Sequence, residues 1–159
     1  MIPPICSRTL NNMAKYHFTF PGTEKAFEIS DYIFEKVIDT IDAEMGLRQQ
    51  LKLILSELYM NAYLHGVNND ISKTIEVYID IGEDEFTTIV KDEGKGLTEN
   101  QYSELVNAEV DYESESGRGM KIVHRLSDKV ELFWDEAGKF CMKCSKGLKN
   151  KPIIVDKNG

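Results

Sequence analysis

Two polar side chains stand one helical turn apart in the stretch ILSELYMNAYLHG (54–66), namely Glu57 and Asn61. Residues four apart on a helix are surface neighbours. The apolar stripe of this helix is formed by Leu51, Leu55, Leu58 and Ala62. The pair therefore lies at the edge of the stripe, where a cleft could adjoin a sheet. An amide oxygen can ligate Mg²⁺, and a carboxylate can orient or deprotonate a nucleophile. The pair suits magnesium-nucleotide chemistry, although ordinary solvated helix positions would also explain it.

A second motif, KDEGKGL (91–97), places D-x-G-x-G at the end of an expected strand. Asp92 is positioned there to accept a hydrogen bond from an exocyclic amine such as that of adenine. Gly94 and Gly96 permit a turn with positive φ and a close approach of a ligand to the backbone. The alternative interpretation is an ordinary Asp-Gly turn.

The third motif, SGRGMKIV (116–123), is a glycine-rich loop that runs into an expected helix. Unpaired N–H groups and the positive end of the helix dipole favour a phosphate at such a position. Gly117, Arg118, Gly119 and Met120 are the candidate binding residues. The glycines could also merely cap the helix.

The elements that must position these motifs follow from the hydrophobic pattern. Alternation predicts strands over 13–20, 74–82 and 85–94, the last two forming a hairpin, and a second hairpin over 129–145. Helical periodicity predicts helices over 24–44, 47–65 and 117–128, and weak helical character near 102–106 within the polar segment 97–116. In the first helix the recurring apolar positions are Phe27, Tyr32, Phe34, Val37, Ile38 and Ile41, and Gly46 would be its C-terminal glycine. This order predicts an α+β two-layer sandwich: a mixed, largely antiparallel sheet covered by helices on one face.

Composition is typical of one soluble globular domain. We expect a domain over 14–146, a flexible N-terminal extension over 1–13 and a Lys-rich flexible tail over 147–159. The net charge of −8 disfavours nucleic acid and anionic membranes as partners. Since the chain has no apolar run of about 20 residues and no secretory signal, we expect a cytoplasmic protein.

The three cysteines do not indicate a disulfide framework. Cys141 and Cys144 have C-x-x-C spacing, but residues three apart on a strand point to opposite faces and cannot hold a metal together. Free thiols in a reducing compartment are the better interpretation.

In their order along the chain, the three motifs resemble those of the Bergerat-fold ATPase superfamily. The phrases LSELYMNAYLHG, VKDEGKGL and ESGRGMKIVHRLSDKVEL are most similar to bacterial anti-sigma-factor serine kinases. The resemblance covers roughly residues 14–146 and implies the Bergerat ATP-binding fold.

The resemblance also implies roles for the candidate residues, with ATP and Mg²⁺ as cofactors. Asn61 would ligate the Mg²⁺ that bridges the phosphates, and Glu57 would be the catalytic carboxylate. His65 would be structural or lie near a phosphate, and Asp92 would bind the adenine amine. The remaining binding residues would be Gly94 and Gly96 at the adenine and Gly117, Arg118, Gly119 and Met120 at the phosphates. Residues 97–116 would then be a lid over the nucleotide.

Members of this family phosphorylate a serine on a small antagonist protein and otherwise hold a sigma factor inactive, commonly as homodimers. In relatives the last hairpin usually carries a Gly-Thr pair whose hydroxyl reaches the nucleotide. Here Gly138 is followed by Lys139, which could contact a phosphate as a point charge or could equally be solvated.

The Gly-Thr departure leaves open an ATP-binding module that sequesters a partner without kinase activity. A histidine-kinase catalytic domain is less consistent with the chain, because His17, His65 and His124 all fall inside expected elements of the ATPase domain.

Overall fold

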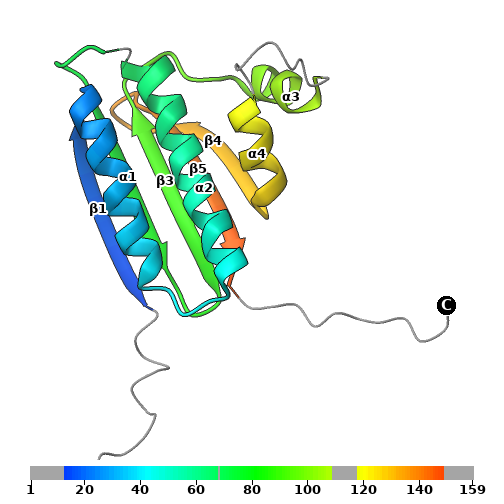
Figure 1. Cartoon of the computed structure of the whole chain (residues 1–159). Helices are drawn as coiled ribbons and strands as arrows, with labels where there is room; N and C mark the ends of the chain where they lie inside the picture. Colours follow the sequence, from blue (N-terminus) through cyan, green and yellow to red (C-terminus); the bar gives the residue numbers. More distant parts are fainter. Residues whose placement is uncertain (1–12, 68, 109–117, 149–159) are drawn as a thin grey trace, which may run out of the picture.

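A five-stranded antiparallel sheet forms one layer of the protein, and helices cover one of its faces (Figure 1). The computed structural model describes residues 13–67, 69–108 and 118–148. The strands in spatial order are β1 (Ala14–Pro21), β2 (Thr74–Ile81), β3 (Glu85–Asp92), β5 (Phe140–Gly147) and β4 (Lys129–Trp134). All four pairings between these strands are antiparallel, so the described sheet is antiparallel throughout. The predicted two-layer fold is confirmed.

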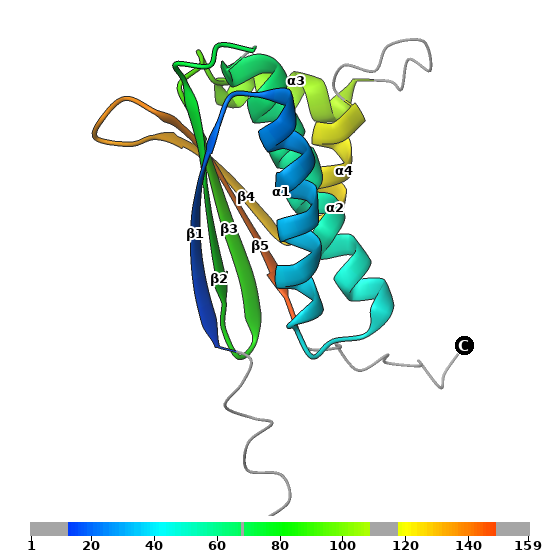
Figure 2. The same ribbon diagram turned by 60° about the vertical axis from the view of Figure 1, so that its left-hand side comes forward.

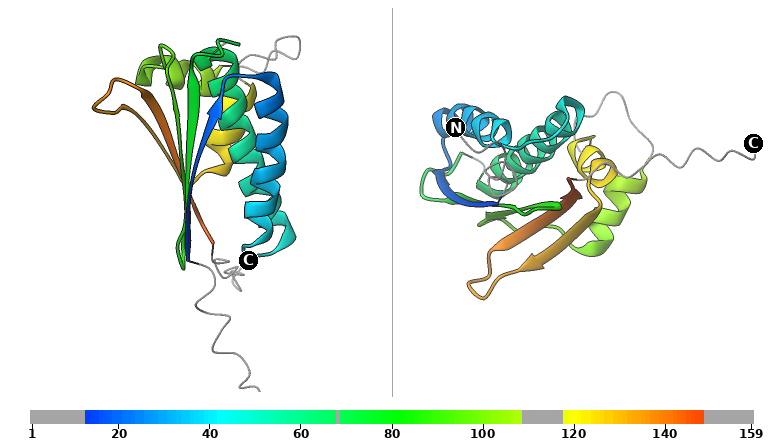
Figure 3. Two further views of the ribbon diagram at one scale, coloured as in Figure 1. Left: turned by 90° about the vertical axis from the view of Figure 1, so that its left-hand side faces the viewer. Right: turned by 90° about the horizontal axis from the view of Figure 1, so that it is seen from below.

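The helical layer is built from α1 (Glu24–Asp39), α2 (Met45–Asn61), the π-helical turn η1 (Ala62–Val67), α3 (Glu99–Asn107) and α4 (Arg118–Leu126). Seen along the sheet, α1, α2 and α4 all lie on the same side of it (Figures 2 and 3). The hydroxyl of Thr23 caps α1 by accepting a hydrogen bond from the Ala26 N–H at 3.1 Å. None of the described helices is long and apolar enough to cross a bilayer.

The core lies between the sheet and α1 and α2. Alternate residues of β2 point toward the helices and are almost fully buried: Ile75, Val77, Ile79 and Ile81. The predicted stripe, which runs along α2 and into η1, is equally buried and packs over β3 and β5 in the same core: Leu51, Leu55, Leu58 and Ala62. Because this stripe is fixed against the sheet, the positions of Glu57 and Asn61 at its edge are fixed as well.

The end of the first helix was predicted wrongly. The helix ends at Asp39 rather than near residue 44, because the Thr40 hydroxyl donates to the Val37 carbonyl at 2.6 Å and the chain turns there. Apolar periodicity continues past the helix because the turn itself buries Ile41. Gly46 lies in the first turn of α2, not at the end of α1, and Tyr32 is 61% exposed rather than part of the core.

Both hairpins are confirmed, with Gly138 of the second turn at φ 81°. Within the polar segment, weak helical character corresponds to α3, which begins with a capping box between Thr98 and Gln101. Residues 109–116 of the expected lid lie outside the described residues. Cys141 and Cys144 are free, buried thiols on opposite faces of β5.

Candidate functional site

A cavity of about 640 Å³ opens where β3 ends, between the sheet and the ends of α2 and α4. Six of the predicted site residues line it: Asn61, His65, Asp92, Gly94, Gly96 and Met120. They come from sequence positions up to 59 apart (61 to 120), so the fold gathers them from distant segments. The other lining residues are Gly66, Lys73, Glu93, Lys95, Leu97, Leu105 and Phe140.

Asp92, the last residue of β3, is the buried acid of the cavity, with only 4% of its surface exposed. Its Oδ1 accepts a hydrogen bond from the Gly94 N–H at 2.8 Å. Burial raises the pKa of the Asp92 carboxyl, while the Gly94 hydrogen bond and the nearby His65 and Lys73 act in the opposite direction. A carboxylate held in this way is a strong acceptor for a ligand N–H group.

Two glycines allow η1 to pack directly on this carboxyl group. A Cβ on Gly66 would lie 2.6 Å from both Cβ and Oδ1 of Asp92, and a Cβ on Gly94 would lie 2.6 Å from the Gly66 Cα. No larger residue fits between the π-helical turn and the end of β3 without a shift. The glycines therefore set the depth at which Asp92 lies.

Asn61 stands where regular α-helix changes to a π-helical turn. The helix α2 ends at Asn61, and η1 continues it from Ala62 to Val67. Such turns are rare and occur frequently at functional sites. The half-buried Asn61 side chain lines the cavity, with its amide nitrogen 3.9 Å from Sδ of Met142. Its carboxamide is thus available at the wall of the cavity.

Glu57 lies one turn before Asn61 and outside the cavity lining. It faces the start of α4 so closely that a Cβ on Gly119 would overlap the Glu57 carboxylate. Burial raises the pKa of the Glu57 carboxyl. A carboxyl group with a raised pKa beside a helix N-terminus is suited to exchanging a proton with a ligand.

The predicted phosphate loop is only partly described. Met120 lines the cavity, whereas Arg118 and Gly119 begin α4 outside the lining, and Gly117 lies outside the described residues. Gly119 contributes by leaving room for Glu57, a role that the sequence motif did not suggest.

Several lining residues were missed by the sequence analysis. Glu93 and Lys95 alternate with the motif residues of the segment 91–97, and this adjacency could have identified them. Leu97 and Leu105 add an apolar wall. Lys73 carries no sequence signal, because it enters the site only through the fold.

Phe140 is the missed residue that lies directly opposite Asp92, because the two residues pair across the β3–β5 ladder. Its ring lies against Gly96, where φ is 71° and a Cβ would come within 2.5 Å of the ring Cγ. The residue facing Asp92 is therefore aromatic. No serine, threonine or tyrosine is found among the described residues that line the cavity.

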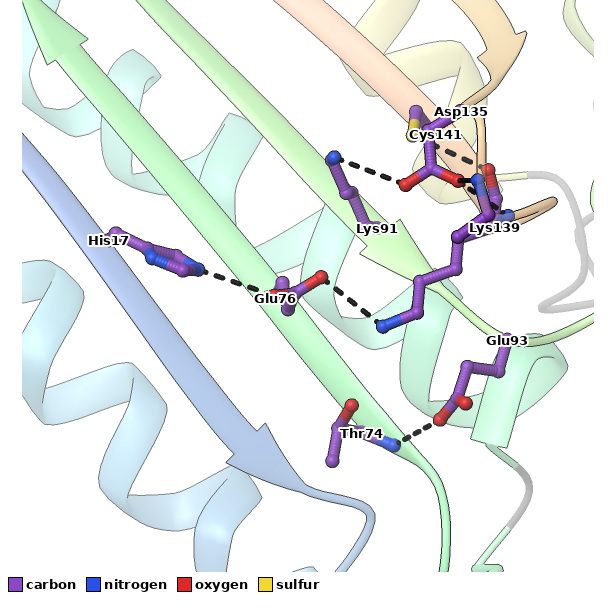
Figure 4. Close-up of polar contacts among 9 residues, drawn as sticks. His17, Thr74, Glu76, Lys91, Glu93, Asp135, Lys139 and Cys141 are labelled. Atoms are coloured by element: carbon purple, nitrogen blue, oxygen red, sulfur yellow. Dashed lines mark hydrogen bonds and ion pairs between the residues drawn. The ribbon is translucent and has the colours of Figure 1, made fainter.

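The suggested contact between Lys139 and a phosphate is wrong for this arrangement. Lys139 does not line the cavity. Its amine lies 3.4 Å from Oε2 of Glu76, on the sheet face that the helices leave open (Figure 4).

Comparison with known proteins agrees with this fold and these motifs. Residues 31–141 match the model of the histidine kinase-like ATPase domain family. The anti-sigma F factor of Clostridium perfringens (strain 13) is 31% identical over 110 residues, which cover 67% of this chain and 78% of that protein. The anti-sigma F factor of Geobacillus kaustophilus is 29% identical over 116 residues, covering 72% of this chain and 79% of that protein.

Two solved structures share the fold. The RsbU and RsbW domains of Rv1364c from Mycobacterium tuberculosis superpose with a TM-score of 0.60 at 18% identity, over 87% of this chain and 33% of that chain. The SiaB–SiaC complex from Pseudomonas aeruginosa gives a TM-score of 0.53 at 13% identity, over 87% of this chain and 92% of that chain. The chain thus belongs to the histidine kinase-like ATPase domain family and is a relative of the anti-sigma F factors within it.

Proposed function

We propose that this protein binds ATP with Mg²⁺ and phosphorylates a serine of a small antagonist protein in a partner-switching circuit, in which a sigma factor is the second partner. The observation that carries the proposal is the arrangement of Asp92 and Asn61 on one cavity, with Glu57 one helical turn away. The kinship with anti-sigma F factors supports the choice of partners.

The base would lie at the Asp92 end of the cavity. The buried carboxylate would accept a hydrogen bond from the exocyclic amine of adenine, while Leu97, Met120 and Phe140 supply apolar surface for the ring. Because Oδ1 is already fixed by Gly94, the carboxyl group is oriented before the ligand arrives.

The side chains present fit a magnesium ion that is held mainly by phosphates. The Asn61 carboxamide offers one oxygen ligand at the cavity wall. No cluster of three or more acidic, histidine or cysteine side chains among the described residues could hold a metal alone. This agrees with the preference of Mg²⁺ for few protein ligands together with substrate phosphates. When bound, the ion would neutralise the charge that develops on the transferred phosphoryl group.

Glu57 would act at the serine hydroxyl. In the proposed step its carboxylate takes the hydroxyl proton, a bond forms between the serine oxygen and the γ-phosphorus, and the bond to the β,γ-bridging oxygen breaks, releasing ADP. The close approach of Glu57 to Gly119 would hold the carboxylate at the start of α4 and limit its rotation.

The first test is calorimetric titration of the whole chain with ATP and Mg²⁺, with Asp92→Asn as the control. Saturable binding that the variant loses supports the site. A folded wild-type chain that does not bind would contradict it.

The second test is incubation with γ-labelled ATP, Mg²⁺ and the cognate antagonist, comparing wild type with Glu57→Gln. Stoichiometric serine phosphorylation by wild type alone supports the kinase. Tight ATP binding without any transfer would instead identify a sequestering module, an alternative suggested by Lys139 standing where relatives carry the threonine of the Gly-Thr pair.

A further inference from the structure

The pair formed by Asp92 and Phe140 is the last pair of the β3–β5 ladder. Beyond it the two segments separate, since β3 leads into the Gly94 turn and β5 is entered from the turn over 135–139. The final pair of a ladder frays most easily, because no further hydrogen bonds follow it. A base site built on this pair needs additional contacts to remain ordered.

Those contacts lie on the face of the sheet that the helices leave open, opposite to the cavity. Successive strand residues point to opposite faces, so Lys91 and Lys139 lie behind their neighbours Asp92 and Phe140. The Lys91 amine is 3.2 Å from Oδ2 of Asp135. Figure 4 shows this pair and the neighbouring polar contacts side by side at the open face.

Asp135 follows β4 and begins the turn that leads into Phe140. Its Oδ1 accepts hydrogen bonds from the N–H groups of Ala137 and Lys139, both at 2.9 Å, while Oδ2 faces Lys91. One carboxylate thus holds the shape of the turn and its distance from β3.

A second ion pair joins the same turn to β2. The Lys139 amine lies 3.4 Å from Oε2 of Glu76, whose other oxygen is 3.4 Å from Nε2 of His17. Directly after β3, Glu93 accepts a hydrogen bond from the N–H of Thr74, the first residue of β2, at 2.7 Å. The contacts reach β1, β2 and β3 from both segments that leave the ladder (Figure 4).

Burial distinguishes these pairs from ordinary surface pairs. The side chains of Lys91, Asp135, Lys139 and Glu76 are 21%, 20%, 30% and 20% exposed. The pair between Lys15 and Asp80 lies toward the other end of the same sheet face, with side chains 84% and 53% exposed and 3.8 Å between them. Partly buried pairs are screened less by solvent, so they can hold geometry that exposed pairs cannot.

We infer that Lys91 and Asp135, supported by Lys139 and Glu76, are positioning residues for base recognition. They hold Asp92 and Phe140 opposite each other from the other side of the sheet. The inference rests on the proposed nucleotide function and extends it to residues that do not touch the ligand.

The test compares the affinity for ATP with that for purine riboside triphosphate, which lacks the exocyclic amine. The ratio used is the dissociation constant for purine riboside triphosphate divided by that for ATP. It measures the contribution of the Asp92 contact to affinity. A variant that only lowers the folded fraction weakens both ligands equally and leaves the ratio unchanged. The variants are Lys91→Met, Asp135→Asn and the double variant, with Lys15→Met as the matched control.

Lys91→Met is expected to lower the ratio by about threefold or more, the range for residues that tune a site without contacting its ligand. Lys15→Met should leave it unchanged. The double variant should be no worse than either single variant, since both remove the same interaction. If Lys91→Met reduces the folded yield too far, Lys139→Met provides the same measurement through the second pair.

A wild-type ratio in Lys91→Met and Lys139→Met would overturn the inference while leaving ATP binding intact. An equal loss in Lys15→Met would overturn it too, because it would indicate a general effect of charge. Failure of the wild-type chain to bind either nucleotide would refute the proposed function itself, and this inference with it.

Discussion

Replacing Gly66 by alanine tests the packing that sets the position of Asp92. The added Cβ would lie 2.6 Å from Cβ and Oδ1 of Asp92. Real Cβ contacts begin near 3.0 Å, so the carboxyl group or η1 must move by at least 3.0 − 2.6 = 0.4 Å, and by more to clear Cγ of Asp92, which lies closer still. Gly94, which is hydrogen-bonded to Asp92, packs on the same side of Gly66, and the neighbouring Ala62 and Val67 of η1 are buried, so η1 has little room to retreat.

Two separate losses are expected from this shift. Overpacking of this kind costs about 1–3 kcal/mol of folding free energy. Displacing the acceptor should also weaken ATP binding by about tenfold or more, the scale of one charge-assisted hydrogen bond. Denaturant unfolding measures the first loss, and calorimetric titration of the folded variant measures the second.

Gly46→Ala is the matched control, because Gly46 also lies in a helix but an added methyl group there would meet no described atom within 4 Å beyond its own helix backbone and chain neighbours. It should be neutral or stabilise the protein by up to about 1 kcal/mol through helix propensity. If Gly66→Ala is as stable as Gly46→Ala and binds ATP normally, the packing argument for Asp92 is refuted.

Three further predictions concern the two carboxyl groups. Asp92→Asn should weaken ATP binding by about 1–3 kcal/mol in calorimetry, and unchanged affinity would remove Asp92 from base recognition. Without nucleotide, the same variant should be more stable than wild type at neutral pH. Burial raises the pKa of Asp92 in the folded protein above its ordinary 3.8. Its favourable contribution to the free energy of unfolding therefore exists at low pH and is lost as pH rises through the folded pKa. The stability advantage of asparagine should vanish in unfolding experiments below about pH 3.8. Because burial also raises the pKa of Glu57 above 4.5, phosphoryl transfer should fail on acidification at a higher pH than an ordinary glutamate would give, and a rate profile that stays flat down to pH 4.5 would contradict a basic role for Glu57.

The sequence was sufficient for the layers of the fold because periodicity reports burial directly. Alternation in β2 and the stripe of α2 each correspond to fully buried rows, and both rows belong to one hydrophobic core. It failed at the end of α1, where Ile41 continues the apolar period although the backbone has already turned. Local hydrogen bonding by Thr40 decided that boundary, and a pattern of apolar residues does not report it.

For the candidate site, the motifs identified residues whose side-chain type itself indicates their chemistry, such as Asn61 and Asp92. They did not identify Phe140 or Lys73, which enter the cavity through strand register and loop placement. Gly119 was assigned to phosphate contact, whereas its described neighbour is Glu57. Such relations require three-dimensional packing, because the partners are far apart in the chain.

The π-helical turn over Ala62–Val67 has a consequence for changes in chain length. Adding or deleting one residue in a helix rotates everything beyond it by about 100°. The π-helical turn holds about one residue more than an α-helical turn, so the same residues wound as a regular α-helix would turn Gly66 away from Asp92. Insertions and deletions should accordingly be excluded from this stretch, whose length is itself part of the proposed nucleotide site.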